Sequence, residues 1–374
     1  MKPTQIPFLK FDDTDEIVET AVKEVISSGV YFNGLFTQNF KEKFTEYVGR
    51  KYMVPTANCT DALEIVLRSL DLLPDDEVIV PAFGWYSDAS MVRLVGAKLL
   101  FLDIDLKTFS VSLKGLEAVY NKKVKALVLP HLYGLISPEI SGIQDFCKQH
   151  AIYLIEDCAQ AHGSTAIDGR AGTFGDAAVF SFYPTKNLGG IGDAGCILSD
   201  NAADVHLFTM LAKHGQTTRN THEILGINSR MDEIQAAILT KRLPLLNYTN
   251  RQRRELAEIY FQKLRHFPIV LPLNNAGHVF HQFVVLSKQR DELRNFLLEK
   301  GVETAVHYPT ALYMMQPFSS AVDLSCPNAL NAAQEVLSLP IYPNHSVEEI
   351  LFVCEQIALF FSDLNASEAP AAVL

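Results

Sequence analysis

Hydrophobic positions between residues 55 and 200 form short, continuous runs that alternate with amphipathic stretches. The runs typical of buried strands are EVIVPA, KLLFLDI, KALVLPHLYG and IYLIED, and the stretches with a helical period are DALEIVLRSL, YSDASMVRLVG and IQDFCKQH. Apolar strands separated by amphipathic helices indicate a mainly parallel sheet that is covered on both faces. The pattern therefore predicts an α/β domain, in which ligands bind beyond the carboxyl ends of the strands.

The pattern changes near residue 230, where a long helical stretch begins. Pro244 interrupts this stretch and should end or kink a helix there. Beyond residue 250 the elements are shorter, as in HQFVVLS and RDELRNFLLEKG, and the final segment NASEAPAAVL is typical of a frayed tail. We therefore expect a large domain over residues 1–245 and a smaller α+β domain over residues 246–374.

The composition is that of a soluble globular protein, with 48% hydrophobic and 20% charged residues among 374. The formal net charge of −11 argues against a nucleic-acid partner, because proteins that bind nucleic acids present a basic face. The first residues lack the uninterrupted apolar core that is typical of a signal peptide, and no run of about 18 uncharged apolar residues follows. We therefore expect a cytoplasmic protein that does not bind a membrane.

The six cysteines are scattered without a C-x-x-C pair, and most of them lie in apolar contexts. This distribution favours small buried side chains over disulfides or metal ligands. It fits a reducing compartment, and it predicts no metal site.

Lys186 lies in the segment SFYPTKNLGGIGDAG, residues 181–195, between two strand-like runs, DAAVF and CILSD. A lysine in a surface turn often serves solubility alone, and that explanation stays open on local grounds. The segment also contains G-x-G-x-x-G at Gly190, Gly192 and Gly195, but a strand follows it where a dinucleotide site requires a helix. Tight turns, or a close approach of the backbone to a ligand, explain these glycines better.

The apolar run IYLIED ends in Glu156 and Asp157, where ligands of a parallel sheet bind, and Gln160 and His162 follow shortly after. Neighbouring side chains of a strand point to opposite faces, so only one of the two acids should face a given site. A helix N-cap at Asp157 explains the same sequence and remains an alternative.

Two further features should lie at the same edge of the sheet. Asn58 and Thr60 lie at the start of an amphipathic helix, whose free N–H groups and dipole favour an anion, although capping alone also accounts for them. Trp85 is the single tryptophan and directly follows a strand-like run. It is placed to stack on a flat ring, unless its role is purely structural.

These features together describe one ligand. A helix start holds a phosphate, an aromatic side chain covers a ring, an acid pairs with a ring nitrogen, and a lysine bonds to a carbonyl. Pyridoxal phosphate carries all of these groups, so the sequence predicts this cofactor. A dinucleotide-dependent sugar oxidoreductase is the remaining enzymatic alternative.

Several long motifs span almost the whole chain, namely NCTDAL, DDEVIVPAFGW, LPHLYG, IEDCAQAHG, GTFGDAAVFSFYPTKNLGGIGDAG, INSRMDEIQAAIL and AVHYP. In these motifs the sequence resembles the DegT-type sugar-nucleotide aminotransferases, which belong to fold type I of the pyridoxal-phosphate enzymes. The resemblance implies a large domain with a mostly parallel seven-stranded sheet between helices, and a smaller C-terminal α+β domain. It also implies a homodimer with shared active sites.

The resemblance implies roles for four residues around the cofactor ring. Lys186 would be the catalytic lysine that bonds the cofactor, and Asp157 would be the catalytic partner of the pyridine nitrogen. Gln160 would donate a hydrogen bond to the ring oxygen, and Trp85 would stack on the ring.

Four other residues would hold the cofactor phosphate. They are Ser181, the helix start at Cys59 and Thr60, and Asn228 of the NSR motif, which would reach the phosphate from the other subunit. The family usually has glycine at the position of Cys59, and we expect the backbone amides to make their contacts despite the cysteine. Relatives that carry histidine in place of the lysine perform dehydration, so Lys186 favours transamination.

The resemblance implies transfer of an amino group from L-glutamate to a nucleotide-linked keto-sugar. AQAHG and SFYPTKNLG are similar to the enzymes that act on 3-keto sugars, which favours a dTDP-3-keto-6-deoxyhexose over a 4-keto sugar nucleotide. A non-catalytic, cofactor-binding regulatory relative is the alternative of a different class. The candidate contacts to the sugar or phosphate of the substrate are Tyr183, His131, Tyr133, His214, His307 and Tyr308, and for each histidine a structural role is the alternative.

Overall fold

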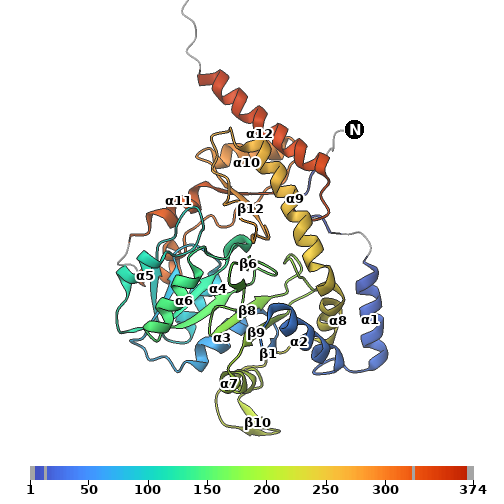
Figure 1. The fold of residues 1–374 in the computed structure, drawn as a ribbon, viewed down its shortest axis with the longest axis vertical. Helices are drawn as coiled ribbons and strands as arrows, with labels where there is room; N and C mark the ends of the chain where they lie inside the picture. The colour runs from blue at the N-terminus through green and yellow to red at the C-terminus, as the bar shows by residue number, and fades with distance from the viewer. Residues whose placement is uncertain (1–4, 12–14, 322–324, 369–374) are drawn as a thin grey trace, which may run out of the picture.

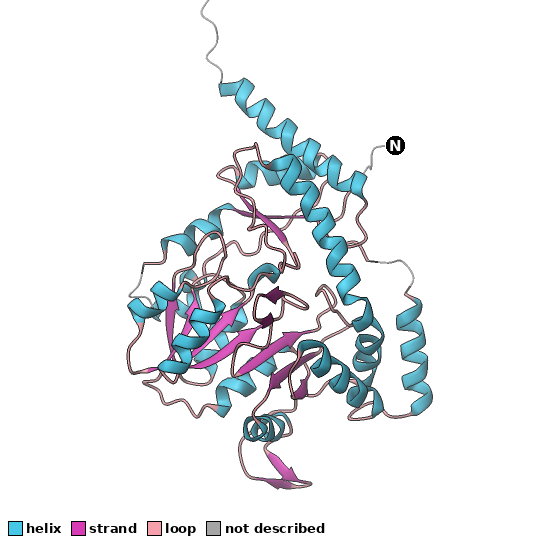
Figure 2. Cartoon of the chain, viewed as in Figure 1, coloured by secondary structure: helices cyan, strands magenta, loops and turns pink. Residues whose placement is uncertain are grey.

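The computed structural model of the protein describes residues 5–11, 15–321 and 325–368. A central sheet lies among helices, and a smaller set of strands and helices packs at the top of the view in Figure 1, with the strands in magenta in Figure 2. The helices are α1 (Glu16–Ser28), α2 (Leu35–Val48), α3 (Cys59–Ser69), α4 (Tyr86–Leu94), α5 (Leu113–Val119), α6 (Ile140–Gln149), α7 (Ala202–Ala212), α8 (Glu233–Arg242), α9 (Leu246–Leu264), α10 (Arg290–Glu299), α11 (Pro327–Glu335) and α12 (Val347–Glu368). The strands are β1 (Tyr52–Thr56), β2 (Glu77–Pro81), β3 (Lys98–Leu102), β4 (Val124–Pro130), β5 (Tyr153–Asp157), β6 (Thr165–Ala166), β7 (Gly169–Arg170), β8 (Ala177–Ser181), β9 (Gly195–Ser199), β10 (Gln216–Thr218), β11 (Thr221–His222), β12 (Phe283–Leu286) and β13 (Val336–Leu339).

The central sheet has seven strands in the order β1-β9-β8-β5-β4-β2-β3. Only β9 runs against its neighbours, because it pairs antiparallel with both β1 and β8 while the remaining pairs are parallel. The register places Pro130 of β4 and Val179 of β8 beside Asp157 of β5. The carboxyl ends of these parallel strands therefore meet at one edge of the sheet, where ligands of such sheets bind.

The two faces of the sheet bury different side chains, because neighbouring residues of a strand point to opposite faces. In β2, Val78 and Val80 belong to one hydrophobic cluster and Ile79 belongs to another, and all three are fully buried. The first cluster includes side chains of α3, α4 and α7, and the second includes side chains of α2, α5, α6 and α8. The predicted α/β class and the mostly parallel seven-stranded sheet are confirmed.

The smaller unit has its own core, built from α9, α10, α12, β12 and β13. Ile6 is fully buried in this core and forms a parallel bridge with Val302, so the N-terminal segment packs with the C-terminal part of the chain. Pro244 lies in a short 3-10 turn, Leu243–Leu245, between α8 and α9, as the sequence predicts. The division of the chain at residue 245 stays a prediction.

The prediction of a frayed tail over residues 365–374 is wrong for residues 365–368. Helix α12 continues to Glu368, and residues 369–374 lie outside the described part of the chain. The segment NASE extends the preceding amphipathic helix, because it contains neither proline nor glycine to end it.

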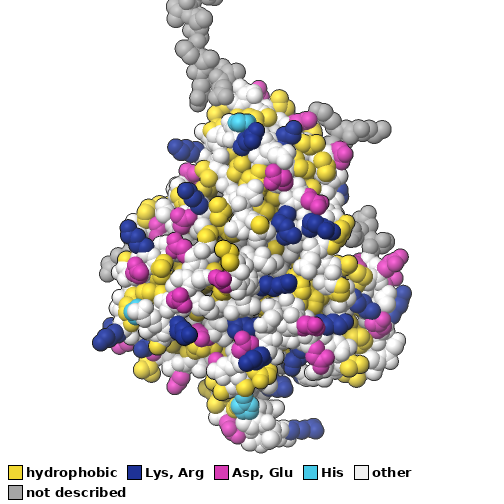
Figure 3. All heavy atoms as spheres, in the orientation of Figure 1, with side chains coloured by type: hydrophobic (Ala, Val, Ile, Leu, Met, Phe, Trp, Pro, Cys, Tyr) yellow, Lys and Arg dark blue, Asp and Glu magenta, His cyan; other side chains and the backbone are white. Residues whose placement is uncertain are grey.

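The described helices include none that is long and apolar enough to cross a membrane. On the face seen in Figure 3, lysine and arginine side chains lie among aspartate and glutamate side chains. All six cysteines are free thiols, five of them buried and Cys59 partly exposed, which confirms the prediction that they form no disulfides.

Candidate active site

A cavity of about 510 Å³ opens at the carboxyl ends of the parallel strands. Its walls come from the start of α3, the loop before α4, the ends of β4, β5 and β8, and the segment around residue 308. The predicted site residues that line it are Cys59, Thr60, Trp85, His131, Asp157, Gln160, Ser181, Tyr183, Lys186, His307 and Tyr308. Segments far apart in the sequence thus bring most of the predicted residues to one place.

Lys186 lies in the loop between β8 and β9, and its N–H group donates a hydrogen bond to the Tyr183 carbonyl (2.9 Å). The side chain is partly buried and lines the cavity. Burial lowers the pKa of its amine below the ordinary value, although the nearby Asp157 carboxylate opposes part of this shift. An amine in this environment loses its proton more easily than a surface lysine, as a nucleophile or base requires.

Asp157 is the last residue of β5, and its side chain is 7% exposed. Its Oδ1 accepts a hydrogen bond from the Ala159 N–H group (2.8 Å), and the Cys59 thiol lies 4.0 Å away. A turn follows β5 and no helix begins there, so the alternative of a helix N-cap at Asp157 is wrong. The carboxylate therefore faces the cavity without a capping role.

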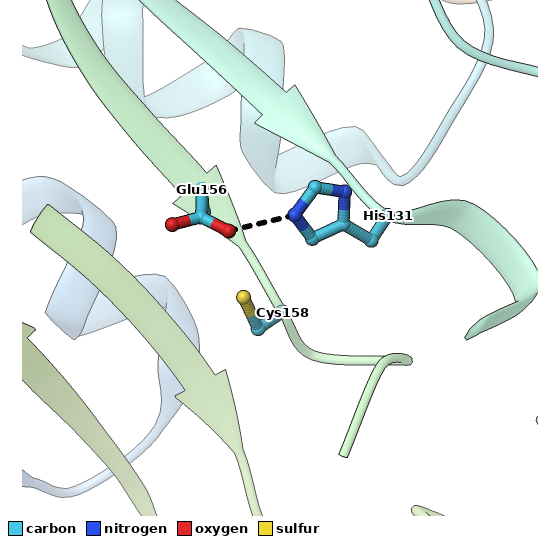
Figure 4. A group of neighbouring side chains, drawn as sticks. All are labelled: His131, Glu156 and Cys158. Carbon is cyan, nitrogen blue, oxygen red and sulfur yellow. Dashed lines mark hydrogen bonds and ion pairs between the residues drawn. The ribbon is translucent and has the colours of Figure 1, made fainter. Parts of the chain in front are cut away.

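Glu156 points to the opposite side of the strand, as expected from alternation, and is completely buried. Its carboxylate accepts hydrogen bonds from the N–H groups of Gly172, Phe174 and Gly175 at 2.6 to 2.8 Å. It also contacts Nε2 of His131 (2.8 Å), beside the Cys158 thiol, as Figure 4 shows. Because backbone amides engage both carboxylate oxygens, this cluster is explained as a bonded network that joins β4, β5 and the turn before β8.

The start of α3 forms one end of the cavity. Oδ1 of Asn58 accepts from the Asp61 N–H group (2.8 Å), so Asn58 is the N-cap, and the first amides of the helix have no partner within it. A Cβ atom on Gly195 would lie 2.4 Å from the carbonyl carbon of Asn58. Only glycine allows β9 to pass this close to the helix start, where Thr60 and Ser181 line the cavity.

Trp85, Gln160 and Tyr308 form the opposite wall. The ring centroids of Trp85 and Tyr308 are 5.4 Å apart, and the indole is 52% exposed, which leaves much of it free to contact a ligand. Gln160 donates to the Tyr308 hydroxyl (3.2 Å) and accepts from the Tyr133 N–H group (2.7 Å). These bonds fix the amide of Gln160 at the cavity wall.

Three histidines near Lys186, among them His281 of the cavity lining, are held neutral, because burial and the charge of Lys186 lower the pKa of each. Burial, together with the positive charge of Lys186, lowers the pKa of His162 to about 3 and that of His307 to about 4. His307 lines the cavity, and its Nδ1 contacts the Ser338 hydroxyl (2.8 Å). The imidazole of His307 therefore acts as a neutral hydrogen-bonding group at physiological pH.

Three predicted residues do not line the cavity. Tyr133 is buried, and its hydroxyl donates to the His307 carbonyl. His214 is exposed in the loop before β10, with a left-handed backbone conformation (φ 60°). Asn228 is exposed and forms an isolated bridge with Lys213, while α8 begins only at Glu233, so Asn228 does not cap that helix.

Asp88 is a cavity residue that sequence reasoning missed. It lies in the first turn of α4, one helical turn after Trp85, and is 1% exposed. The sequence signal that could have indicated this role is its position three residues after Trp85. An acid in the first turn of a helix is usually an exposed partner of the helix dipole, which is why the sequence alone does not assign it to the site.

Comparison with known proteins identifies the family. Residues 12–358 match the model of the DegT/DnrJ/EryC1/StrS aminotransferase family. The chain belongs to this family. The expected family, the fold and the enzyme class, a sugar-nucleotide aminotransferase that depends on pyridoxal phosphate, are thereby confirmed.

Three relatives and one solved structure illustrate the similarity. A pleiotropic regulatory protein of Geobacillus stearothermophilus is 36% identical, covering 90% of this chain and 92% of that protein. A UDP-N-acetyl-3-dehydro-α-D-glucosamine 3-aminotransferase of Acidithiobacillus ferrooxidans is 36% identical (90% and 91% covered), and a dTDP-3-amino-3,6-dideoxy-α-D-galactopyranose transaminase of Aneurinibacillus thermoaerophilus is 35% identical (94% and 98%). The crystal structure of DesV from S. venezuelae with a ketimine intermediate has a TM-score of 0.91 at 32% identity, covering 96% of this chain and 99% of DesV.

Proposed function

We propose that this protein transfers the amino group of L-glutamate to the C3 keto group of a dTDP-linked 3-keto-6-deoxyhexose. The product is a 3-amino-3,6-dideoxyhexose, which serves glycan or lipopolysaccharide synthesis. The observation that carries the proposal is the placement of Lys186 and Asp157 in one cavity whose end is the start of α3. The names of two relatives at 35% and 36% identity, both of which specify position 3 of the sugar, support the choice of C3.

The residues of the cavity fit pyridoxal phosphate. Its phosphate matches the helix start at Cys59 and Thr60, beside Ser181, because that helix start offers free amides and a positive dipole end. The half-exposed indole of Trp85 would stack on the ring, and the amide of Gln160 would donate to the ring oxygen. The fit also rests on Asp88 and Asp157, two buried acids that face a partly buried lysine.

Lys186 and Asp157 divide the chemistry between them. When bound, the cofactor supplies a carbonyl that bonds amines and a ring that accepts electrons from the carbon bearing the amino group. Lys186 would hold the cofactor through its side-chain amine, and as a free amine it would act as the general base and acid that moves a proton at the substrate carbon. Asp157 would stabilise a proton on the pyridine nitrogen, because its carboxylate is buried and anchored by the Ala159 amide.

The remaining lining residues would bind the sugar. Tyr183 is 50% exposed at the rim, and the rings of His131, His307 and Tyr308 line the interior. Nδ1 of His131 has no hydrogen-bond partner within the described part of the chain, whereas its Nε2 contacts Glu156. A sugar hydroxyl is a suitable partner for such a buried ring nitrogen.

A substrate panel tests the proposed keto position. We expect the purified enzyme with L-glutamate to convert a dTDP-3-keto-6-deoxyhexose with a kcat/KM at least about tenfold above that of the 4-keto isomer, a difference of about 1.4 kcal/mol in transition-state binding. NMR of the product should place the amine at C3. Faster conversion of the 4-keto sugar, with the amine at C4, would contradict the choice of C3.

We also propose that the active site is shared by two subunits of a homodimer. Ser229, next to Asn228, donates to Asp61 of α3 (2.7 Å) and accepts from the Ala57 N–H group (2.9 Å). These bonds hold the segment rigidly against the start of α3 while the Asn228 side chain stays exposed and outside the cavity of its own subunit. An exposed amide on an anchored segment is suited to reach the cofactor phosphate of a partner subunit.

Mixed dimers of Lys186→Ala and Asn228→Ala test this sharing at limiting cofactor. In a mixed dimer one site carries both substitutions and the other carries neither, so activity should rise above that of either parent. Subunit exchange is verified separately with affinity tags. If exchange occurs without a gain in activity, each subunit completes its own phosphate site.

A further inference from the structure

Asp88 is a buried acid in the lining of the cavity, and no N–H or hydroxyl group of the described residues donates a hydrogen bond to it. Its side chain is 1% exposed, and neither carboxylate oxygen has a hydrogen-bond partner among the residues that the structure describes. A buried carboxylate without donors is costly, because burial removes the water that would otherwise stabilise its charge. The position therefore calls for a specific explanation.

The titratable groups that face Asp88 come from four other segments. Asp157 at the end of β5 contacts its carboxyl, and Lys186 of the β8–β9 loop lies nearby. Cys59 at the start of α3 and Tyr308 of the segment after α10 line the same cavity, and the charge of Asp88 affects both. Asp88 thus has a second carboxyl as its immediate neighbour, and Lys186 is the one cation of this group.

Two carboxyl groups in contact inside a protein cannot both carry a charge at low cost, so they share a proton. Burial raises the pKa of Asp88 well above its ordinary value, and the adjacent Asp157 charge raises it further against the opposing effect of Lys186. Asp157 accepts a backbone amide hydrogen bond, whereas Asp88 accepts none. The surroundings of the two carboxyl groups therefore favour a proton on Asp88.

We propose that Asp88 is a positioning residue, a neutral carboxylic acid whose O–H group donates a hydrogen bond to the carboxylate of Asp157. Together with the Ala159 amide, this bond fixes the orientation of Asp157 in the cavity. The inference rests on the proposed role of Asp157 toward the pyridine nitrogen. In this arrangement Asp88 stays protonated, and its hydrogen bond holds the charged Asp157 carboxylate in place.

Two substitutions of Asp88 distinguish a role as a neutral hydrogen-bond donor from a role as a charged group. Asp88→Asn keeps the shape and a donor, so the pH titration of the visible absorbance of the lysine-bound cofactor should match that of the wild type. Asp88→Ala removes the donor, so this titration should shift and cofactor retention should fall. Turnover of Asp88→Ala should drop about ten- to hundredfold, the usual effect of losing a hydrogen bond to a charged group.

Two outcomes would overturn the inference. If Asp88→Asn shifts the titration as much as Asp88→Ala, the residue acts through its charge. If both variants titrate and retain cofactor as the wild type does, Asp88 has no positioning role.

The cofactor-free protein gives an independent readout. An acid whose pKa is raised by folding binds more protons in the folded state, so its contribution to stability falls as pH rises above about 3.9, the unfolded value. Asp88→Asn removes this contribution. Its unfolding temperature minus that of the wild type should therefore increase as pH rises above the unfolded value, until pH passes the folded pKa of Asp88.

Asp71→Asn is the matched control, because Asp71 is exposed and does not line the cavity. For each variant, the quantity compared is its unfolding temperature minus that of the wild type. If this quantity changes with pH no more for Asp88→Asn than for Asp71→Asn, Asp88 is not protonated in the folded protein. Since no substrate or cofactor is present, this result is independent of whether the proposed reaction is correct.

Discussion

Replacing Lys186 by alanine should abolish turnover while leaving the fold intact. Loss of proton transfer by a positioned base alone lowers rates by about 10²- to 10⁴-fold, and the covalent hold on the cofactor disappears as well. Because the start of α3 is unchanged, the variant should still bind the cofactor non-covalently. The visible absorbance of the lysine-bound form should be missing, which a spectrum of the purified protein checks.

Lys148→Ala is the matched control, because Lys148 is an exposed residue of α6 outside the cavity. It should keep the turnover and the spectrum of the wild type. Circular dichroism of both variants confirms that folding is unaffected. Normal turnover of Lys186→Ala would refute the role assigned to this lysine.

Replacing Asp157 by alanine should lower turnover by about 10²-fold or more, because without this carboxylate the pyridine nitrogen loses its proton and the ring accepts electrons poorly. Asp157→Asn is the more informative variant. It keeps the shape and an oxygen that accepts the Ala159 amide, but it removes the charge. Turnover of both variants, measured with saturating cofactor, should therefore fall.

The opposite outcome has a clear physical meaning. If Asp157 only stabilises the turn after β5, Asp157→Ala should cost about 1 kcal/mol of stability with activity retained, and Asp157→Asn should behave as the wild type. Thermal unfolding measured alongside turnover distinguishes the two cases.

The sheet and most of the cavity could be predicted because local patterns decide them. Continuous apolar runs define β2, β3, β4 and β5, and the predicted bounds agree with the observed strands within a few residues. Strand geometry alone predicts that Glu156 and Asp157, as neighbours in β5, point to opposite faces of the sheet. This prediction needs no knowledge of the fold. The role of a strand end as a binding position follows from parallel topology alone.

Other features depend on contacts between distant segments and leave no local signal. Glu233 of α8 caps the start of α2, accepting hydrogen bonds from the N–H groups of Gly34, Phe36 and Thr37 at 2.9 to 3.1 Å. Asp88 is equally hidden, because its sequence position is that of an ordinary first-turn acid. Only the fold, which brings the first turn of α4 and the end of β5 to one cavity, places it near Asp157.

Tyr133 is a residue that the sequence places in the site but that does not line the cavity. Its motif HLYG suggested a substrate contact, but its backbone adopts a left-handed conformation (φ 59°) and its hydroxyl donates to the His307 carbonyl. The side chain is buried and does not itself line the cavity. A local motif gives no information on this backbone conformation.

The central claim is that Lys186 of this cavity holds pyridoxal phosphate covalently. Borohydride reduction of the cofactor-loaded protein makes the lysine–cofactor bond permanent, and peptide mass spectrometry then locates it. We expect a stoichiometric pyridoxyl group on the peptide that contains Lys186, and we expect its loss when L-glutamate is added before reduction. A stoichiometric modification of a different lysine, or none on Lys186, would contradict the claim.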